Sequence, residues 1–157
     1  MEKRIKIQPI NKLSDYRKKN LMTLLNWRNE TSTRINFLNQ NIIDLNQHEK
    51  WIKNLRKNTN NKINIFYKSK TPIGVCYIIN KKKKYYLSYS IDKKFRNRGY
   101  GGKMLKLFFK KINKKFYKNK IFAKVLPKNK KSIKILINHN FFITNKNSRI
   151  IEMKLLN

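Results

Sequence analysis

The sequence predicts an α/β (α+β) fold, in which helices flank a mixed, mostly antiparallel central sheet. Three strand patterns follow one another in the middle of the chain, at 63–68, 73–79 and 85–91, and their short connections allow only antiparallel hairpins. A glycine-rich turn then leads into a helical apolar stripe. An apolar run at 121–126 follows that helix, and the right-handed crossover rule places it parallel to the strand before the turn.

The N-terminal part is expected to supply one strand and two helices. Isoleucines alternate over 4–10 and predict the first strand. Leucines and Trp27 at helical spacing predict a helix over 16–29, whereas 31–45 lacks strong periodicity and predicts a loop or short helices that cover a site. Asn46 is the expected N-cap of the next helix. The inner face of this helix carries His48, Trp51, Ile52 and Leu55.

The second half completes the order β-α-α-β-β-β-α-β-α-β-β. Four lysines at 81–84 are expected to form the solvated tip of a hairpin. Asn129 to Ser132 opens a last helix, and 141–144 and 149–155 form a final hairpin. The helix after the glycine turn is predicted from the apolar residues Leu105, Phe108, Phe109, Ile112 and Phe116.

Length and cysteine content narrow the class of protein. The 157 residues fit a single domain, 1–157, that can bury a core without disulfide bonds. Cys76 is the only cysteine, so no intrachain disulfide and no zinc site built on several cysteines is expected; it lies in an apolar strand pattern and is predicted to be buried. No signal-peptide pattern and no apolar run of membrane-spanning length occurs, which predicts a cytoplasmic protein without membrane insertion.

The net charge is +33, from 40 Lys and Arg against 7 Asp and Glu. Such a charge ordinarily favours nucleic acid or an anionic membrane as the partner. Lysine, asparagine and isoleucine are spread over every segment, and their A/T-rich codons explain much of the excess without a binding function. No helix-turn-helix, zinc or RNA-recognition signature appears, so no specific nucleic-acid partner is predicted.

Three of the four glycines, Gly99, Gly101 and Gly102, lie between the strand at 85–91 and the following helix. A glycine turn at a helix N-terminus leaves backbone N–H groups free to bind a phosphate or pyrophosphate. The spacing fits neither a P-loop nor a dinucleotide fingerprint, because Met104 stands where the latter needs its third glycine.

The pattern Arg96-x-x-Gly99-x-Gly101 resembles the acetyl-CoA-binding motif (Q/R-x-x-G-x-G/A) of the GNAT superfamily of N-acetyltransferases. The resemblance implies the GNAT fold, acetyl-CoA as co-substrate and no metal. It also implies that the loop amides hold the pyrophosphate, while the preceding strand holds the pantetheine arm through backbone hydrogen bonds. The expected coenzyme-binding residues of this region are Ile91, Arg96, Asn97, Arg98, Gly99, Tyr100, Gly101 and Gly102.

A second stretch, Asn129-x-x-Ser132 followed by Ile135-Leu136 and Asn140-Phe141, resembles the family signature N-x-x-S/A-x-x-L-Y-x-x-x-G-F. The resemblance implies that Asn129 contacts the pantetheine arm. Leu136 stands where many members carry a tyrosine proposed to protonate the departing thiolate, and Asn140 replaces the glycine. The general acid is therefore left open.

Trp27-Arg28-Asn29 and His48-x-x-Trp51, followed by Ile73-Gly74, are similar to GNAT enzymes that acetylate nucleotide-linked amino sugars on routes to pseudaminic and related nonulosonic acids. This similarity implies that Trp27, Arg28, Asn29 and His48 bind the acceptor, a small and anionic nucleotide sugar, in an enzyme that is a possible homodimer. Family members that acetylate protein N-termini or small amines are the alternative. A non-catalytic, basic nucleic-acid- or ribosome-binding protein with a GNAT-like core is the third hypothesis.

Acetyl transfer to an amine needs a neutral nucleophile and a donor for the oxyanion. The resemblance implies a backbone N–H near 90–92 as that donor. The predicted catalytic residues are Tyr89, Ser88 and Ser90, acting through water. Glu30 and His48 are the alternative bases, and His139 is expected to be a capping or surface residue. A polyamine acceptor fits poorly, because the +33 charge would repel it.

Overall fold

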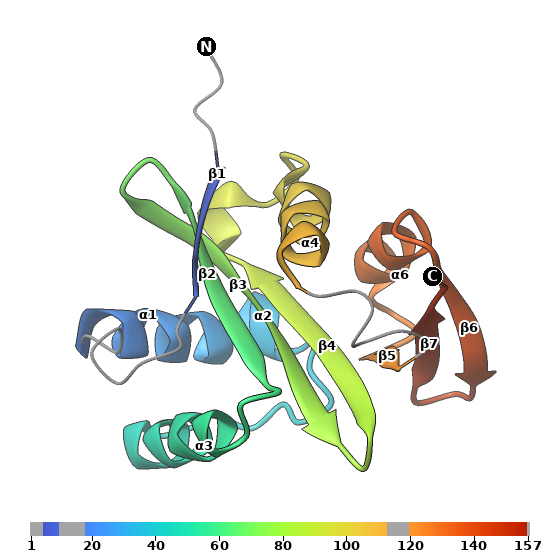
Figure 1. Ribbon diagram of the computed structural model, residues 1–157, viewed down its shortest axis with the longest axis horizontal. Coiled ribbons are helices and arrows are strands. Elements are labelled where there is room, and N and C mark those ends of the chain that lie inside the picture. Colours follow the sequence, from blue (N-terminus) through green and yellow to red (C-terminus); the bar gives the residue numbers. More distant parts are fainter. Residues whose placement is uncertain (1–4, 10–17, 113–119, 157) are drawn as a thin grey trace.

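The computed structural model describes residues 5–9, 18–112 and 120–156. One seven-stranded sheet in the order β1-β2-β3-β4-β5-β7-β6 carries helices on both faces (Figure 1). The elements are β1 (Ile5–Pro9), α1 (Lys18–Asn29), α2 (Thr31–Arg34), α3 (Leu45–Lys57), β2 (Lys62–Lys68), β3 (Thr71–Lys81), β4 (Lys84–Ile91), η2 (Lys93–Phe95), α4 (Tyr100–Lys111), β5 (Ile121–Val125), α6 (Lys130–Ile137), β6 (Phe141–Lys146) and β7 (Ile151–Leu155).

The expected order of elements is confirmed, with the short helix α2 added in the segment predicted as a loop or short helices. Strands β1 to β4 form an antiparallel meander, and β5 pairs with β4 in parallel, as the crossover rule predicts. The final hairpin of β6 and β7 joins the sheet through β5. The fold is therefore a mixed, mostly antiparallel sheet.

Two apolar clusters hold the helices to the sheet. On one face, α4 and α6 pack through Met104, Leu105, Phe108 and Leu136. On the other, α1 and α3 pack on β2 and β3 through a smaller cluster that includes Leu24, Trp27, Ile52, Ile63 and Val75. Cys76 is fully buried in the first cluster, as its strand pattern predicts.

Strand β4 contributes to both faces, because successive side chains of a strand point in opposite directions. Tyr85, Leu87 and Tyr89 belong to the α4 and α6 face. Ser90 points the other way, into a pocket under α1 and α3. The period-two pattern of the sequence thus separates Tyr89 from Ser88 and Ser90 by the thickness of the sheet.

Strands β4 and β5 pair only at their start. The parallel register joins Tyr85–Leu87 to Ile121–Ala123 and stops there, while β5 continues along β7. Residues 88–91 of β4 therefore turn one edge to an opening between the two strands. An extended chain could use the backbone groups of such an edge as hydrogen-bond partners.

One helix start differs from its prediction. Asp44, not Asn46, caps α3: its side chain accepts a hydrogen bond from the Gln47 amide at 2.8 Å, and the Gln47 side chain accepts one from the Asp44 amide at 3.1 Å. This reciprocal capping box satisfies two backbone donors that Asn46 would have left open. The predicted helical residues 16 and 17, together with Phe116, lie outside the described residues.

The lysine hairpin is confirmed. Lys81 pairs with Lys84, and Lys82 and Lys83 make the turn with φ of 49° and 65°. Positive φ at both central residues matches the right-handed twist of the strands. Across the described ranges, no helix has both the length and the apolar character needed to cross a membrane.

Candidate functional site

The glycine turn presents free backbone donors at the start of α4. The Lys103 amide donates to the Gly99 carbonyl at 3.3 Å as the first bond of the helix, so the amides of Tyr100, Gly101 and Gly102 lie outside its hydrogen-bond ladder. Gly99 adopts a φ of 73°, and apart from Gly99 and its two chain neighbours no atom of the described residues lies within 4 Å of the place a Cβ would occupy. The turn therefore leaves its amides accessible at the positive end of the helix dipole.

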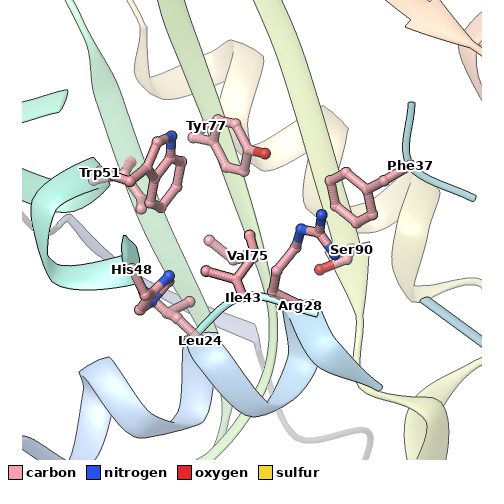
Figure 2. A pocket seen from close by; sticks show the side chains of 10 residues that line it. Leu24, Arg28, Phe37, Ile43, His48, Trp51, Val75, Tyr77 and Ser90 are labelled. Carbon is pink, nitrogen blue, oxygen red and sulfur yellow. The ribbon is translucent and has the colours of Figure 1, made fainter. Parts of the chain in front are cut away.

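A cavity of about 130 Å³ lies on the opposite face of the sheet, between α1, α3 and the strands (Figure 2). His48 and Trp51 of α3 lie at one end of it, and Arg28 and Phe37 at the other. A cavity of about 150 Å³ accommodates a benzene ring, so this one suits a single planar ring. Its lining consists of Leu24, Arg28, Phe37, Ile43, His48, Trp51, Ile63, Val75, Tyr77 and Ser90.

Arg28 is the charged group of this lining. Its Nη2 donates to the Asn39 carbonyl at 2.6 Å, and its guanidinium lies over the Phe37 ring, 4.6 Å from the centroid. Its Nη1 is buried without a partner among the described residues. Burial lowers the pKa of Arg28 from its ordinary value, with Arg34 adding repulsion and Tyr77 opposing it. A buried donor without a partner costs free energy, which an acceptor atom of a ligand would recover.

His48 is the second polar group with an unused atom. It is 3 % exposed and stacks on Trp51 at a centroid distance of 5.6 Å. Its ring bonds the backbone of Leu21, while Nε2 has no partner among the described residues. Burial and the nearby Arg28 charge lower its pKa, although Glu49 and the bond to Leu21 oppose them. At neutral pH the ring is uncharged, and Nε2 can accept a proton or a hydrogen bond.

The catalytic candidates on β4 occupy different surroundings. Ser90 lines the cavity, and Ser88 is a hydrogen-bond partner of Tyr77, whose pKa burial raises. Tyr89, on the other face, places its hydroxyl 3.0 Å from the Ser132 hydroxyl of α6. Burial raises the pKa of Tyr89 to about 12, although the bond to Ser132 opposes it. The Tyr89 hydroxyl therefore keeps its proton and can donate it, but cannot serve as a base at neutral pH.

Trp27 and Asn29, predicted to bind the acceptor, lie outside the cavity lining. The Trp27 indole donates to the Asp92 carboxylate at 2.9 Å, which ties α1 to the end of β4. Asn29 pairs with the backbone of Ile43, donating at 2.7 Å and accepting at 2.9 Å. Of the four acceptor residues predicted, the structure brings Arg28 and His48 into the cavity and uses Trp27 and Asn29 to fix its walls.

Arg96 is bound to the segment that follows α1. Its guanidinium donates to the Ile91 carbonyl, to the hydroxyls of Ser32 and Thr33, and to the Glu30 carboxylate at 3.2 Å. Glu30 also caps α2, accepting from the amides of Ser32 and Thr33. Arg98 is exposed, and Asn97 accepts a hydrogen bond from Lys131 at 2.8 Å.

Glu30 is an anion held by donors, not a base. Burial alone would raise its pKa, but the hydrogen bonds from Ser32, Thr33 and Arg96 outweigh it and lower the pKa to about 2. A carboxylate with so low a pKa accepts a proton poorly at neutral pH. The structure thus gives Glu30 a role in joining α2 to the loop.

This depressed pKa predicts an acid-dependent loss of stability. The native state gains from ionised Glu30 fully above the unfolded pKa near 4.5, and loses that gain as the pH falls toward 2. Glu30→Gln is expected to lower the free energy of unfolding by about 1 kcal/mol at pH 6, and the difference from the wild type should shrink between pH 4.5 and 2. Urea unfolding over this pH range measures it; a difference that is constant with pH would contradict the assignment.

Two polar residues lie at the two ends of α6. Asn129, predicted to contact the coenzyme, caps α6 by accepting a hydrogen bond from the Ser132 amide at 3.2 Å. His139 lies between α6 and α4, with Nδ1 2.8 Å from the Ile135 carbonyl and Nε2 3.0 Å from the Gly102 carbonyl. It therefore connects the glycine turn to the last helix.

Sequence reasoning missed part of the cavity wall. Tyr77 and Phe37 carried no motif, and Phe37 lies in the segment without periodicity. The described residues hold no group of three or more His, Cys, Asp or Glu side chains arranged for a metal ion.

Comparison with known proteins gives a consistent family match. The family model described as an acetyltransferase (GNAT) domain matches residues 12–141. No curated protein sequence matches the chain.

Solved structures resemble the chain over nearly its whole length, at low identity. The Campylobacter jejuni N-acetyltransferase PseH in complex with acetyl coenzyme A is 18% identical, covers 98% of this chain and 99% of its own, and has a TM-score of 0.73. Spermidine N-acetyltransferase from Vibrio cholerae in complex with CoA and spermine is 13% identical, with coverages of 97% and 95% and a TM-score of 0.79. Ribosomal-protein-alanine N-acetyltransferase from Brucella melitensis is 15% identical, with coverages of 98% and 99% and a TM-score of 0.76.

Proposed function

The chain belongs to the acetyltransferase (GNAT) family, and from that premise we propose that its acceptor is the primary amine of a nucleotide-linked amino sugar. Its fold is the GNAT fold, and it is an acetyl-CoA-dependent N-acetyltransferase. In the transfer the amine nitrogen attacks the thioester carbonyl and forms the C–N bond. The C–S bond then breaks, the nitrogen loses a proton, and the sulfur of CoA takes one up.

The two halves of the proposed site meet at β4. The amides of Tyr100, Gly101 and Gly102 would hold the coenzyme's pyrophosphate, and the unpaired edge at 88–91 would hold its pantetheine arm. Asn129 stands at the start of α6, across the opening. The thioester would then lie near Ser90, which lines the acceptor cavity.

Tyr89 supplies the proton for the departing sulfur in this proposal. Leu136 is 1 % exposed and apolar, so it cannot donate a proton. The hydroxyl pair of Tyr89 and Ser132 joins β4 to α6 at the edge that β5 leaves open. With a pKa of about 12, the Tyr89 hydroxyl is protonated when the thiolate forms.

One observation carries the choice of acceptor: the cavity is an apolar, aromatic slot with two unused polar atoms, Arg28 Nη1 and His48 Nε2. The first is a donor, and the second is an acceptor in the uncharged ring. A nucleobase offers a flat ring with neighbouring donors and acceptors on its edge. A nucleotide-linked sugar also brings a diphosphate to a protein with a net charge of +33.

A polyamine acceptor is cationic and does not fit the charges of this cavity. Acidic side chains would have to neutralise its amines, and the lining residues described for the cavity include none. Its one ionic group is Arg28, a cation. The carboxylates of Glu30 and Asp92 are already paired, with Arg96 and with Trp27. Spermine therefore lacks the partners that a buried ammonium group needs.

The test is a comparison of acceptors under one set of conditions. The enzyme is incubated with acetyl-CoA and, separately, UDP-linked 4-amino sugars, spermine and a peptide with an N-terminal alanine, and release of CoA thiol is followed alongside product mass. We expect kcat/KM for a nucleotide sugar to exceed that for spermine by at least about tenfold, since one lost charge-assisted contact costs this much. A preference for spermine or for the peptide would overturn the acceptor assignment.

Arg28→Ala is expected to raise the acceptor KM by roughly 10- to 100-fold, because it removes a charged donor from the cavity. The Kd of acetyl-CoA should stay within about twofold, since Arg28 lies on the face of the sheet away from the turn at α4. Steady-state kinetics and calorimetry measure the two quantities. Arg28→Lys, which keeps the charge but not the planar fork, should lie between. A tenfold loss of coenzyme affinity with unchanged acceptor kinetics would contradict the role.

A further inference from the structure

We propose that Arg96 is a positioning residue that couples the coenzyme turn to the acceptor-side segment 30–44, and that it acts through Glu30 and α2 and not on the coenzyme's pyrophosphate. The inference rests on the proposed function in one respect, that the cavity bounded by this segment is the acceptor's half of the site. It replaces the prediction that Arg96 is itself a coenzyme ligand.

The donors of Arg96 are almost fully used. A guanidinium has five N–H groups. Nε donates to the Ile91 carbonyl at 3.0 Å, Nη1 to Ser32 Oγ at 2.5 Å, and Nη2 to both Thr33 Oγ1 and Glu30 Oε2. One N–H remains, on Nη1. Bidentate recognition of a phosphate by arginine uses two parallel N–H groups, and no such pair is left.

Helix α2, which Arg96 contacts, is too short to be stable on its own. Helix α2 has four residues, far fewer than an isolated helix needs to be stable. Its N-terminus is fixed by Glu30, which accepts from the Ser32 amide at 3.1 Å and the Thr33 amide at 2.9 Å. The ion pair with Arg96 is half-buried, with 29% and 24% of the two side chains exposed. The conformation of α2 therefore depends on a residue of the coenzyme turn.

Helix α2 leads directly into the wall of the cavity. Arg34, its last residue, donates to the Gln40 carbonyl at 2.7 Å, and Arg28 donates to the Asn39 carbonyl at 2.6 Å. Asn29 holds the backbone of Ile43, which lines the cavity. A continuous set of hydrogen bonds runs from Arg96 to the Glu30 carboxylate, from the Arg34 amide to the Glu30 carbonyl, and from the amide of Phe37, which lines the cavity, to the Arg34 carbonyl.

Coenzyme binding should affect the cavity wall through these hydrogen bonds. Acetyl-CoA that orders the turn around Gly99 also fixes Arg96, three residues away, and Arg96 then holds α2 and the cavity wall. Linkage requires the reverse as well: an occupied acceptor cavity must strengthen coenzyme binding by the same factor. The enzyme would thus complete its acceptor site when the acetyl donor is in place.

Hydrogen exchange with acetyl-CoA as the only ligand tests the coupling without knowledge of the acceptor. In the wild type, acetyl-CoA should slow amide exchange in 30–44 by roughly fivefold or more. Glu30→Gln, Arg96→Met and the double variant should all lose this protection, and the double variant should be no worse than the singles. The Kd of acetyl-CoA should remain within about fivefold of wild type in each variant. Lys94→Met is the matched control, because Lys94 lies two residues before Arg96, its side chain is exposed and, among the described residues, only its backbone amide makes a hydrogen bond, to Asp92; it should keep the protection.

Three results would overturn the proposal. If Arg96→Met weakens acetyl-CoA binding by a hundredfold while Glu30→Gln does not, Arg96 is a direct ligand. If acetyl-CoA protects 30–44 equally in wild type and Glu30→Gln, the contacts between Arg96 and Glu30 do not couple the two half-sites. If acetyl-CoA leaves 30–44 unprotected in the wild type, the two half-sites are independent. Failure of the nucleotide sugar as a substrate would change none of these results, so the two proposals fail separately.

Discussion

Gly74→Ala is expected to destabilise the protein by about 3 kcal/mol, because β3 has no room for a methyl group at this position. A Cβ there would lie 2.6 Å from the Ser90 carbonyl oxygen, 2.9 Å from the sulfur of Met104 and 3.1 Å from Ile91 Cδ1. The first of these atoms belongs to the backbone of the paired strand β4, so a side-chain rotation cannot relieve the contact. Urea unfolding should show a lower midpoint with an unchanged m value.

Gly102→Ala is the matched control for this substitution. Its Cβ would lie 3.4 Å from His139 Cε1, an ordinary contact, and its position inside α4 favours alanine by up to about 1 kcal/mol. Its stability should therefore equal or exceed that of the wild type. Equal stabilities for Gly74→Ala and the wild type would show that β3 and β4 can separate at this point, contrary to the register of the sheet.

The order of the sheet followed from the sequence because each signal was local. Short connections between β2, β3 and β4 allow only antiparallel pairing, and the helix between β4 and β5 requires a parallel crossover. The predicted start of α3 was wrong because asparagine and aspartate both cap helices, so the residue type alone does not choose between Asn46 and Asp44. The reciprocal hydrogen bond of Gln47 decides in favour of Asp44. Helix α2 was not resolved from the sequence, since it depends on Arg96, sixty-two residues beyond its end.

The site was predictable where a residue's role is set by its own segment. The glycine turn and the alternation of β4 follow from spacing within single elements, whereas Arg28 and His48, which line the cavity, were implied by the family resemblance. The pairings of Trp27 with Asp92 and of Tyr89 with Ser132 join residues 65 and 43 positions apart. The spacing of apolar residues along the chain does not reveal such long-range contacts. The sequence therefore cannot distinguish a tryptophan that supports the cavity wall from one that binds a ligand.

Gly101→Val is expected to weaken acetyl-CoA binding by about 100-fold or more, which corresponds to about 2.7 kcal/mol. A Cβ at this position would lie 3.0 Å from Ile135 Cδ1 of α6 and 3.9 Å from the Tyr89 ring. The tip of Ile135 can yield to one methyl group, so Gly101→Ala should retain most of the affinity. The two further methyl groups of valine must push the N-terminus of α4 away from α6, which moves the free amides of Tyr100, Gly101 and Gly102 together.

The acetyl-CoA affinity of Gly101→Val distinguishes two explanations of how this turn binds an anion. If the amides act as a fixed array, a displacement of α4 lowers affinity steeply, while Gly102→Ala, whose methyl group faces His139, keeps it within about threefold. If the positive charge of the protein acts instead, both variants bind equally, and both lose affinity steeply as salt is raised. Calorimetric titration with acetyl-CoA at two salt concentrations, on variants whose circular dichroism shows a native fold, distinguishes them. Unchanged affinity in folded Gly101→Val would remove the turn from the coenzyme site.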